Sequence, residues 1–203
     1  MTATASLADA SSKFDLLQHS FYQRWSAGTL TREELDDYAG QYAYVVAGLP
    51  GWLRDAAIAN PEHALELERH AHEEDGHVAL WQKFAMAVDP ARAGAFDHPN
   101  PATVALLERC DELAAAGQAV TVAWAMEAQS PEVSEAKLDG LRRHYGIDAT
   151  SGGEYFELHR DRDREHRDEL AAMIPAGDPR AAGAAEAVFS GLWDLLTSVE
   201  RAA

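Results

Sequence analysis

Apolar side chains in this chain recur at the three- and four-residue spacing of helices, between residues that start and stop helices. The first such series is formed by Phe14, Leu17, Phe21 and Trp25. Gly28 follows it as a stop signal. No stretch of strand length alternates apolar and polar residues, and isoleucine occurs only three times among 203 residues. The pattern therefore predicts an all-α fold.

Start and stop signals divide the chain into seven expected helices. Thr31 and Glu34 have the spacing of a capping box that opens the second helix. Pro50 should kink this helix rather than end it, because the apolar pattern continues beyond it. Asn60 and Pro61 are expected to cap and open the third helix. The expected helices span residues 14–28, 31–58, 60–88, 100–129, 130–146, 154–174 and 178–199. Short connections without repeats indicate one all-helical domain over residues 1–203.

The charge balance excludes several classes of partner. The chain has 17 Lys and Arg against 34 Asp and Glu, a net charge of −17, and no basic patch that could contact a phosphate backbone. We therefore expect neither nucleic acid nor an anionic membrane surface as a partner. The single cysteine, Cys110, excludes an internal disulfide framework and a thiolate metal cluster. No targeting sequence and no apolar run of about 20 residues is recognisable, which predicts a cytoplasmic protein.

The expected helix over residues 154–174 carries the clearest chemical signal. Its core-facing stripe runs through Tyr155, His159, Asp163, His166 and Leu170. Three titratable side chains thus occupy positions where core packing favours leucine, and burying them unpaired costs several kcal/mol. A divalent metal ion bound by both imidazoles and the carboxylate satisfies all three. The alternative is a charged helix whose histidines join a surface network.

Two other expected helices hold further candidate ligands. Glu127 is the only charged residue of AVTVAWAMEAQ, and it lies near the negative end of the helix dipole, where a cation would stabilise it. Glu74 and His77 form the Glu-x-x-His pair that di-iron carboxylate bundles project inward. His70 and Glu73 lie close to that face, so the spacing leaves open whether Glu73 or Glu74 binds. Taken singly, these residues also fit an exposed glutamate at a fraying helix end and an ordinary polar helix face.

Together the three segments offer three histidines and three carboxylates. This set suits two iron or manganese ions in sites of nitrogen and oxygen ligands. It has too many carboxylates for one tetrahedral zinc, and a set without thiolates does not bind an iron–sulfur cluster. The sequence therefore predicts a pair of metal ions between three helices.

Several motifs resemble one branch of the heme-oxygenase-like dimetal oxidases. HRDRDREH, residues 159–166, is similar to the family's H-x-x-x-D-x-x-H signature. The segments HSFYQRWSAGTL, LDDYAGQYAYVVAGLP, EEDGHVALWQKFA and MEAQSPEVSEAKLDGLRRHYG also resemble that branch. The branch is that of the Chlamydia protein associating with death domains, whose neighbours are TenA and PqqC. The resemblance covers roughly residues 14–170.

The resemblance implies a seven-helix heme-oxygenase-like bundle that holds two irons instead of heme, with manganese as an alternative at one position, and that activates O2. The implied metal ligands are Glu74 (or Glu73), His77, Glu127, His159, Asp163 and His166. Tyr22, Tyr38 and Lys137 match positions implicated in making p-aminobenzoate from one of the branch's own tyrosines. Met126 stands where the branch often has a tyrosine. The implied function is an oxidase that acts on a small amino-acid-derived substrate or on its own tyrosine, with an external reductant.

Two other functions remain as alternatives. A TenA-like thiaminase, a hydrolase without metal, needs a nucleophilic cysteine shortly before Glu127, whereas Cys110 lies too far upstream. A non-catalytic partner-binding bundle would leave the polar stripe of residues 159–166 unexplained. For Tyr22 and Tyr38, the corresponding alternative is packing in an aromatic core. The sequence does not fix the oligomeric state, although helical bundles of this size often form homodimers.

Overall fold

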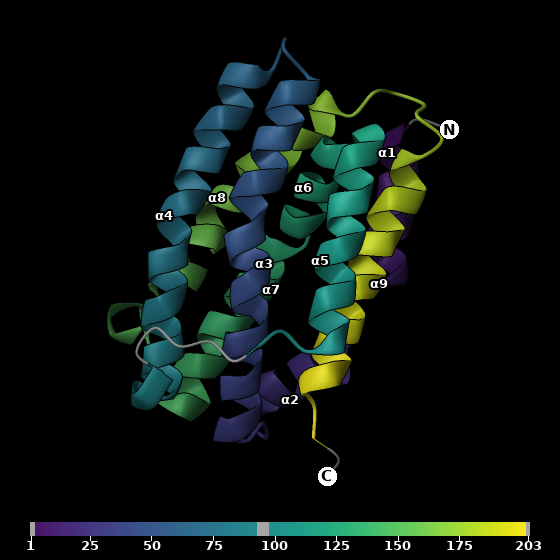
Figure 1. Ribbon diagram of the computed structural model, residues 1–203. Helices are drawn as coiled ribbons and strands as arrows, with labels where there is room; N and C mark the ends of the chain where they lie inside the picture. Colours follow the sequence, from purple (N-terminus) through teal and green to yellow (C-terminus); the bar gives the residue numbers. More distant parts are fainter. Residues whose placement is uncertain (1–2, 93–97, 202–203) are drawn as a thin grey trace.

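The computed structural model describes residues 3–92 and 98–201, which form a bundle of α-helices (Figure 1). Within these two ranges there is no strand, and the predicted all-α class is confirmed. The α-helices are α1 (Ala3–Lys13), α2 (Ser20–Ala27), α3 (Arg32–Ala59), α4 (Ala64–Val88), α5 (Pro101–Leu113), α6 (Ala119–Glu127), α7 (Ser130–Gly140), α8 (Glu154–Met173) and α9 (Ala181–Val199). Short 3₁₀ or π-helical segments flank several of them.

The arrangement of the bundle places one short helix in the interior. The long helices α3 and α4 lie side by side, and α5 packs along α9 (Figure 1). All nine residues of α6 are buried, and this helix contacts α3, α8 and α9. Helix α8 packs against α6, α7 and α4. Helix α8 therefore contacts both of the other helices that carry predicted metal ligands, α4 and α6.

The second predicted helix is confirmed together with its start signal. The Thr31 side chain accepts a hydrogen bond from the Glu34 N–H, and the Glu34 carboxylate accepts one from the Thr31 N–H. Helix α3 continues through Pro50, so the proline does not end it. Tyr38 and Tyr42 lie one turn apart in the part of α3 before Pro50, with ring centroids 5.4 Å apart.

The prediction of a single helix over residues 100–129 is wrong. Asn100 caps α5 as expected, because its side chain accepts a hydrogen bond from the Thr103 N–H. The helix is interrupted at Gly117, whose φ of 82° lies in the left-handed region that glycine enters at little cost. After this break α6 starts as a separate helix and carries Glu127 as its last residue.

The N-terminal part of the chain also differs from the prediction. Helix α1 is absent from the predicted set, because its many alanines and serines give only a weak apolar pattern. In the structure it packs against α9 and buries Leu7 and Ala10. The predicted first helix begins only at Ser20, after a 3₁₀ turn over Leu16–Gln18.

Asn60 has a different role from the predicted one. Its side chain and its backbone N–H donate hydrogen bonds to the carbonyl of Ala56, at 2.7 and 2.9 Å. These bonds close the preceding helix, and α4 begins only at Ala64. The last three predicted helices are confirmed, with a π-helical turn over Leu141–Tyr145 at the end of the first of them. None of the described helices combines the length and the apolar character that a membrane span requires.

Candidate functional site

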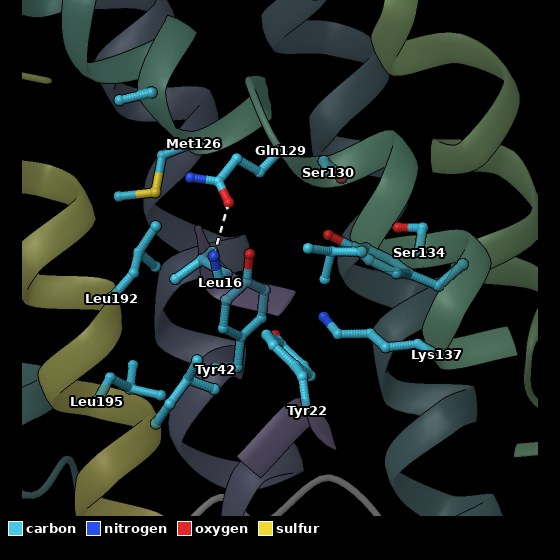
Figure 2. Close-up of a pocket in the computed structure, with 14 residues that line it drawn as sticks. Leu16, Tyr22, Tyr42, Met126, Gln129, Ser130, Ser134, Lys137, Leu192 and Leu195 are labelled. Carbon is cyan, nitrogen blue, oxygen red and sulfur yellow. Dashed lines mark hydrogen bonds between the residues drawn. The ribbon is translucent and has the colours of Figure 1, made fainter. Parts of the chain in front are cut away.

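A hollow of about 20 Å³ lies between several helices (Figure 2). Residues that the sequence analysis singled out are among those that line it. Tyr22 and Lys137 line it, together with Tyr42 and Tyr155. Leucines of α9 and Met126 supply an apolar wall opposite Lys137. The amine of Lys137 points into the hollow from α7 (Figure 2). The hollow thus combines one amine with several phenols in an apolar setting.

Lys137, Tyr38 and Tyr22 form a hydrogen-bonded cluster. Lys137 Nζ donates to the Tyr38 hydroxyl at 2.6 Å, and the hydroxyl oxygens of Tyr38 and Tyr22 are 3.3 Å apart. All three residues are buried. Burial lowers the pKa of Lys137 to about 7 and raises the pKa of Tyr38 well above its ordinary value. Near neutral pH the cluster therefore holds a partly uncharged amine beside protonated phenols.

Aromatic packing accounts for part of this cluster. The Tyr38 ring lies 5.1 Å from that of Phe21 and 5.6 Å from that of Trp25, measured between ring centroids. Such packing explains why the tyrosine rings are buried. It does not explain Lys137, because burying an amine among rings costs free energy that a leucine would not.

A second hollow of about 20 Å³ adjoins the first. The residues that line both hollows are Tyr42, Met126, Ser130 and Tyr155. The second hollow is also lined by Glu127, His159 and Asp163. The phenol–lysine cluster and the predicted metal ligands therefore lie on either side of a shared wall.

All six predicted metal ligands are buried, with 0 to 7% of each residue exposed. Helix α4 carries Glu74 and His77, α6 carries Glu127, and α8 carries the other three, which are His159, Asp163 and His166. The alternatives of a fraying glutamate, an exposed polar face and a surface histidine network are wrong for these residues. Their polar atoms must find partners inside the bundle.

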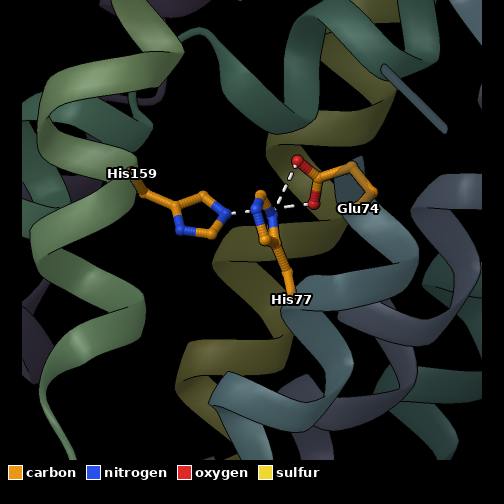
Figure 3. Close-up of side chains that lie close together, drawn as sticks. All are labelled: Glu74, His77 and His159. Carbon is orange, nitrogen blue, oxygen red and sulfur yellow. Dashed lines mark ion pairs between the residues drawn. The ribbon is translucent and has the colours of Figure 1, made fainter. Parts of the chain in front are cut away.

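The first group of converging ligands joins α4 and α8. One ligand atom each from Glu74, His77 and His159 lies within 4.8 Å of the other two. His77 Nδ1 is 2.9 Å from Glu74 Oε1, and His159 Nε2 is 3.9 Å from Glu74 Oε2 (Figure 3). This spacing suits a metal ion held by two imidazoles and a carboxylate.

The second group shares one member with the first. Glu74, Glu127 and His166 also place one ligand atom each within 4.8 Å of the others. His166 Nδ1 is 3.6 Å from Glu127 Oε2. Glu74 therefore belongs to both candidate cation positions.

The unpartnered polar atoms of the six residues fit this interpretation. Nine of their side-chain nitrogen and oxygen atoms are buried without a hydrogen-bond partner, including both oxygens of Glu74, Glu127 and Asp163. Leaving so many buried acceptors unsatisfied costs about 1–3 kcal/mol for each group, and more for a charged one. Bound cations would satisfy the carboxylates and the imidazole nitrogens together.

Polar contacts on the outer side of two histidines orient them toward the centre. His159 Nδ1 donates to the Tyr155 carbonyl at 2.7 Å, which leaves Nε2 for a metal. His166 Nε2 is 3.2 Å from Glu73, which leaves Nδ1 on the inner side. Metal-binding histidines usually have such an outer partner, because it fixes the tautomer and the ring orientation.

The electrostatics of the cluster also favour a cation. Burial raises the pKa of Glu127 well above its ordinary value, and repulsion from Asp163 and Glu74 adds to the effect. Burial lowers the pKa of His166 to about 4, so its imidazole is neutral and has a free electron pair at pH 7. A divalent cation would stabilise the carboxylate charges that crowd one another here.

Glu73 and Glu74, between which the sequence leaves the choice open, face different surroundings. Glu74 is 1% exposed and belongs to both groups. The Glu73 carboxylate lies at the rim, where it accepts hydrogen bonds from Arg162 at 2.7 Å and Arg69 at 3.0 Å. Those partners neutralise Glu73 without a metal.

Sequence reasoning did not assign Tyr155 and His70 to the site. Tyr155 lines both hollows and stacks on His159 with ring centroids 3.8 Å apart. His70 is fully buried and belongs to a third group, with Glu66 and Glu169. The available signal was helical spacing, because Tyr155 precedes His159 by four residues and His70 precedes Glu74 by four.

Comparison with known proteins identifies the family and the fold of the chain. Residues 36–198 match the family model described as iron-containing redox enzyme. The 4-aminobenzoate synthase of Nitrosomonas europaea is 31% identical over 211 residues, which cover 91% of this chain and 85% of that protein. A TenA homologue from Pseudomonas syringae superposes with a TM-score of 0.81 at 14% identity, covering 97% of this chain and 90% of its own. A CADD-like protein of unknown function from Nostoc punctiforme gives 0.68 at 16% identity, covering 95% and 94%.

These matches confirm the predicted fold and the predicted resemblance. The solved structures share the TenA-like, heme-oxygenase-like arrangement of helices with this chain. The family model covers most of the chain, including all six predicted metal ligands. The chain belongs to the family of iron-containing redox enzymes.

Proposed function

We propose that this protein is a di-iron oxidase that uses O2 to convert one of its own tyrosines into a 4-aminobenzoate-like product. The observation that carries the proposal is the position of Glu74 between two groups of buried ligands, next to the Lys137–Tyr38–Tyr22 cluster. The relative from Nitrosomonas europaea is named a 4-aminobenzoate synthase.

The ligand groups indicate how two ions would be held. Glu74, His77 and His159 would bind the first ion, and Glu74, Glu127 and His166 the second. Asp163 lines the same hollow as Glu127 and His159 and would add a further carboxylate. Two bound irons supply the O2 activation that no side chain of the chain can provide.

The phenol–lysine cluster would supply the reacting organic groups. In 4-aminobenzoate the nitrogen stands opposite the carboxyl carbon, at the ring position where tyrosine carries its oxygen. Lys137 Nζ lies 2.6 Å from that oxygen in Tyr38, and 5.1 Å from the ring centroid of Tyr22. Burial keeps this amine partly uncharged, and an uncharged amine is the nucleophilic form.

The size of the hollow favours an internal substrate over an external one. Its volume of about 20 Å³ is close to that of a single water molecule by the same measure. An external amino-acid-derived substrate, the second candidate, would need the lining to open first. A tyrosine of the chain needs no such opening, because the Tyr22 side chain already lines the hollow.

Intact mass spectrometry tests the choice of substrate. The protein is reconstituted anaerobically with Fe(II), then exposed to O2 and a reductant. We expect the protein to lose mass at Tyr22 or Tyr38, which supplies the ring, and at Lys137, which supplies the amine nitrogen, while an aminobenzoate is released. Tyr22→Phe and Tyr38→Phe should identify the consumed ring, and Tyr145→Phe, whose hydroxyl contacts the Leu30 backbone rather than the Lys137 cluster, is the control. Oxygen uptake with an unchanged protein mass would favour the external substrate.

Metal analysis of the same preparation tests the class of function. We expect about two irons per chain together with O2 consumption. A preparation that binds no metal under these conditions would favour a TenA-like hydrolase or a partner-binding bundle. The hydrolase has little support in the site, because Cys110 is fully buried and burial raises its thiol pKa to about 12.

A further inference from the structure

Helices α4 and α8 carry the same motif of polar residues. In α8 the order is His159, Asp163 and His166, and in α4 it is His70, Glu74 and His77, with identical spacing. The two motifs meet in opposite order. The rings of His77 and His159 have centroids 4.5 Å apart, and those of His70 and His166 4.1 Å apart. Each end of the paired motifs thus holds two imidazoles.

His70 has the burial and the unmet hydrogen bonding of a ligand. It is fully buried, and its Nδ1 atom is buried without a hydrogen-bond partner. Across residues 3–92 and 98–201, ten buried side-chain atoms lack a partner in this way, and His70 Nδ1 is the one that lies outside the six predicted ligands. A histidine that only filled the core would leave this nitrogen unsatisfied at a cost in stability.

The outer contacts of His70 match those of His166. His70 Nε2 is 2.8 Å from the Glu169 carboxylate, as His166 Nε2 is 3.2 Å from Glu73. Arg69 donates to both carboxylates, at 3.2 Å to Glu169 and 3.0 Å to Glu73. In both histidines Nε2 is therefore fixed on the outer side, and Nδ1 is the nitrogen left for a metal.

We infer that His70 is a seventh metal ligand, which completes the position of Glu74, Glu127 and His166 through Nδ1. This inference rests on the proposed pair of metal ions. With His70, each position has two imidazoles, because the second position gains a second nitrogen ligand beside His166. Imidazole ligands favour Fe(II) over Mn(II), whereas carboxylates and water suit Mn(II). His70 therefore selects iron at the second position.

Competition between the two metals tests this inference. Wild-type protein is loaded anaerobically with equal Fe(II) and Mn(II), and the bound metals are counted by mass spectrometry. His70→Phe keeps a ring against His166 but removes both nitrogens. We expect it to weaken binding of one of the two ions by about tenfold or more and to lower the preference of that position for iron. Absorption of the Co(II)-loaded variant should show that one ion has changed its coordination.

Three further variants assign the position and control for indirect effects. The double variant His70→Phe/His166→Gln should bind metal only slightly more weakly than His166→Gln alone, because both residues would bind the same ion. The loss of metal affinity caused by His70→Phe should add to that caused by His159→Gln, which removes a ligand of the other ion. Glu66→Gln, which alters only the outer group of Glu66, His70 and Glu169, should leave metal binding unchanged. His72→Gln on the exposed face of α4 is the matched histidine control. Circular dichroism of each metal-free variant checks that the bundle is folded.

Two results would overturn the inference while leaving the proposed function intact. The first is a His70→Phe protein that binds both ions with wild-type affinity, metal preference and Co(II) spectrum. The second is a Glu66→Gln protein that loses an ion as His70→Phe does, because the ion would then belong to the outer group. Wild-type protein that binds no pair of ions would instead contradict the proposed function itself.

Discussion

At the residue scale, the site is built from side chains that a protein core normally excludes. Glu127 and Asp163 are buried with both carboxylate oxygens unpartnered, and Lys137 is buried among aromatic rings. Each such group lowers stability unless a cation or a change of protonation balances it. Groups of this kind cluster at functional sites, where their perturbed pKa values serve the chemistry.

Replacing Lys137 by methionine should stabilise the protein while abolishing product formation. The free energy of unfolding at pH 7 should rise by roughly 1–3 kcal/mol, because the unfolded wild-type chain protonates an amine that the folded protein keeps partly neutral. The folded pKa of about 7 lies below the ordinary 10.5, so wild-type stability increases with pH between these values. The advantage of the variant should therefore shrink at pH 9, as measured by urea unfolding.

The control for this experiment is Lys83→Met, which alters an exposed lysine paired with Glu154. Lys83→Met should change the free energy of unfolding by no more than about 0.5 kcal/mol, and it should leave the yield of product unchanged. A Lys137→Met protein less stable than wild type at pH 7 would show that the amine is charged and well paired in the folded state.

At the scale of helices, the position of the site depends on a break that precedes the interior helix. Gly117 adopts a left-handed conformation between α5 and α6, so α6 can run through the interior independently of α5. The end of α6 then presents Glu127 to α8. An uninterrupted helix over the same residues would continue the line of α5, which packs along α9.

Gly117→Ala should lower the free energy of unfolding by about 1–2 kcal/mol, because the left-handed conformation is less favourable for alanine than for glycine by about that amount. The added Cβ would meet no atom within 4 Å, so the conformation alone is tested. Gly183→Ala in α9 is the matched control, because its Cβ also meets nothing and its backbone is helical. The control should raise stability by roughly 0.5–1 kcal/mol in thermal or urea unfolding. Equal effects of the two substitutions would contradict a strained position at Gly117.

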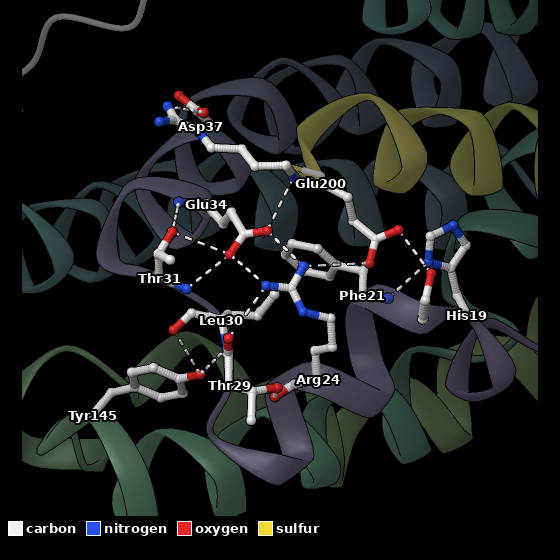
Figure 4. Close-up of polar contacts among 12 residues, drawn as sticks. His19, Phe21, Arg24, Thr29, Leu30, Thr31, Glu34, Asp37, Tyr145 and Glu200 are labelled. Carbon is white, nitrogen blue, oxygen red and sulfur yellow. Dashed lines mark hydrogen bonds and ion pairs between the residues drawn. The ribbon is translucent and has the colours of Figure 1, made fainter. Parts of the chain in front are cut away.

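At the scale of the whole molecule, the buried Glu34 at the start of α3 connects α2 with the segment that follows α9 (Figure 4). Glu34 accepts hydrogen bonds from both terminal nitrogens of Arg24, at 2.6 and 2.8 Å. It also accepts one from the backbone N–H of Arg201 at 3.0 Å. These contacts connect α2 and the start of α3 with the segment that follows α9.

Glu34→Gln should lower the free energy of unfolding at pH 7 by about 2 kcal/mol, because Arg24 would lose a charged partner. Burial alone would raise the pKa of Glu34, but hydrogen bonds from Arg24 and Thr31 outweigh it and lower the pKa to about 2. The stability that Glu34 contributes is therefore present above its ordinary pKa of 4.5 and is lost as the pH falls toward 2. Acid titration of unfolding should show the difference from wild type shrinking over that range. Glu33→Gln, at an exposed neighbour, is the matched control and should change the free energy of unfolding at pH 7 by no more than about 0.5 kcal/mol.

Metal ions should stabilise the bundle as a whole, because their ligands come from three helices. Fe(II) added anaerobically should raise the melting temperature, and each ion contributes about 2.7 kcal/mol at a hundredfold excess over its dissociation constant. Glu74→Gln should remove most of this gain, since Glu74 belongs to both ligand groups, whereas His77→Gln should keep the contribution of one ion. Asp75→Asn, at an exposed neighbour, is the control, and differential scanning fluorimetry with and without a chelator measures all four proteins.

Much of the fold could be predicted from the sequence, because the signals that start and stop helices are local. The capping box at Thr31 and the stop at Gly28 act within a few residues, and both are confirmed. Prediction failed where local signals were weak or ambiguous. Gly117 lies inside an otherwise helical pattern, and Asn60 can end one helix as readily as it can begin another.

The order of polar and apolar residues along the chain determined by itself that this chain forms a helical bundle, and it predicted a stripe of acids and imidazoles on the core-facing side of one helix. Periodicity expresses which face of a helix avoids water, and that is a property of the sequence alone. Only the tertiary structure decided which carboxylate is shared between the two ligand groups, and that His70 meets His166. Those relations join residues roughly 50 to 100 positions apart, and they depend on how α4, α6 and α8 pack, which no local pattern encodes.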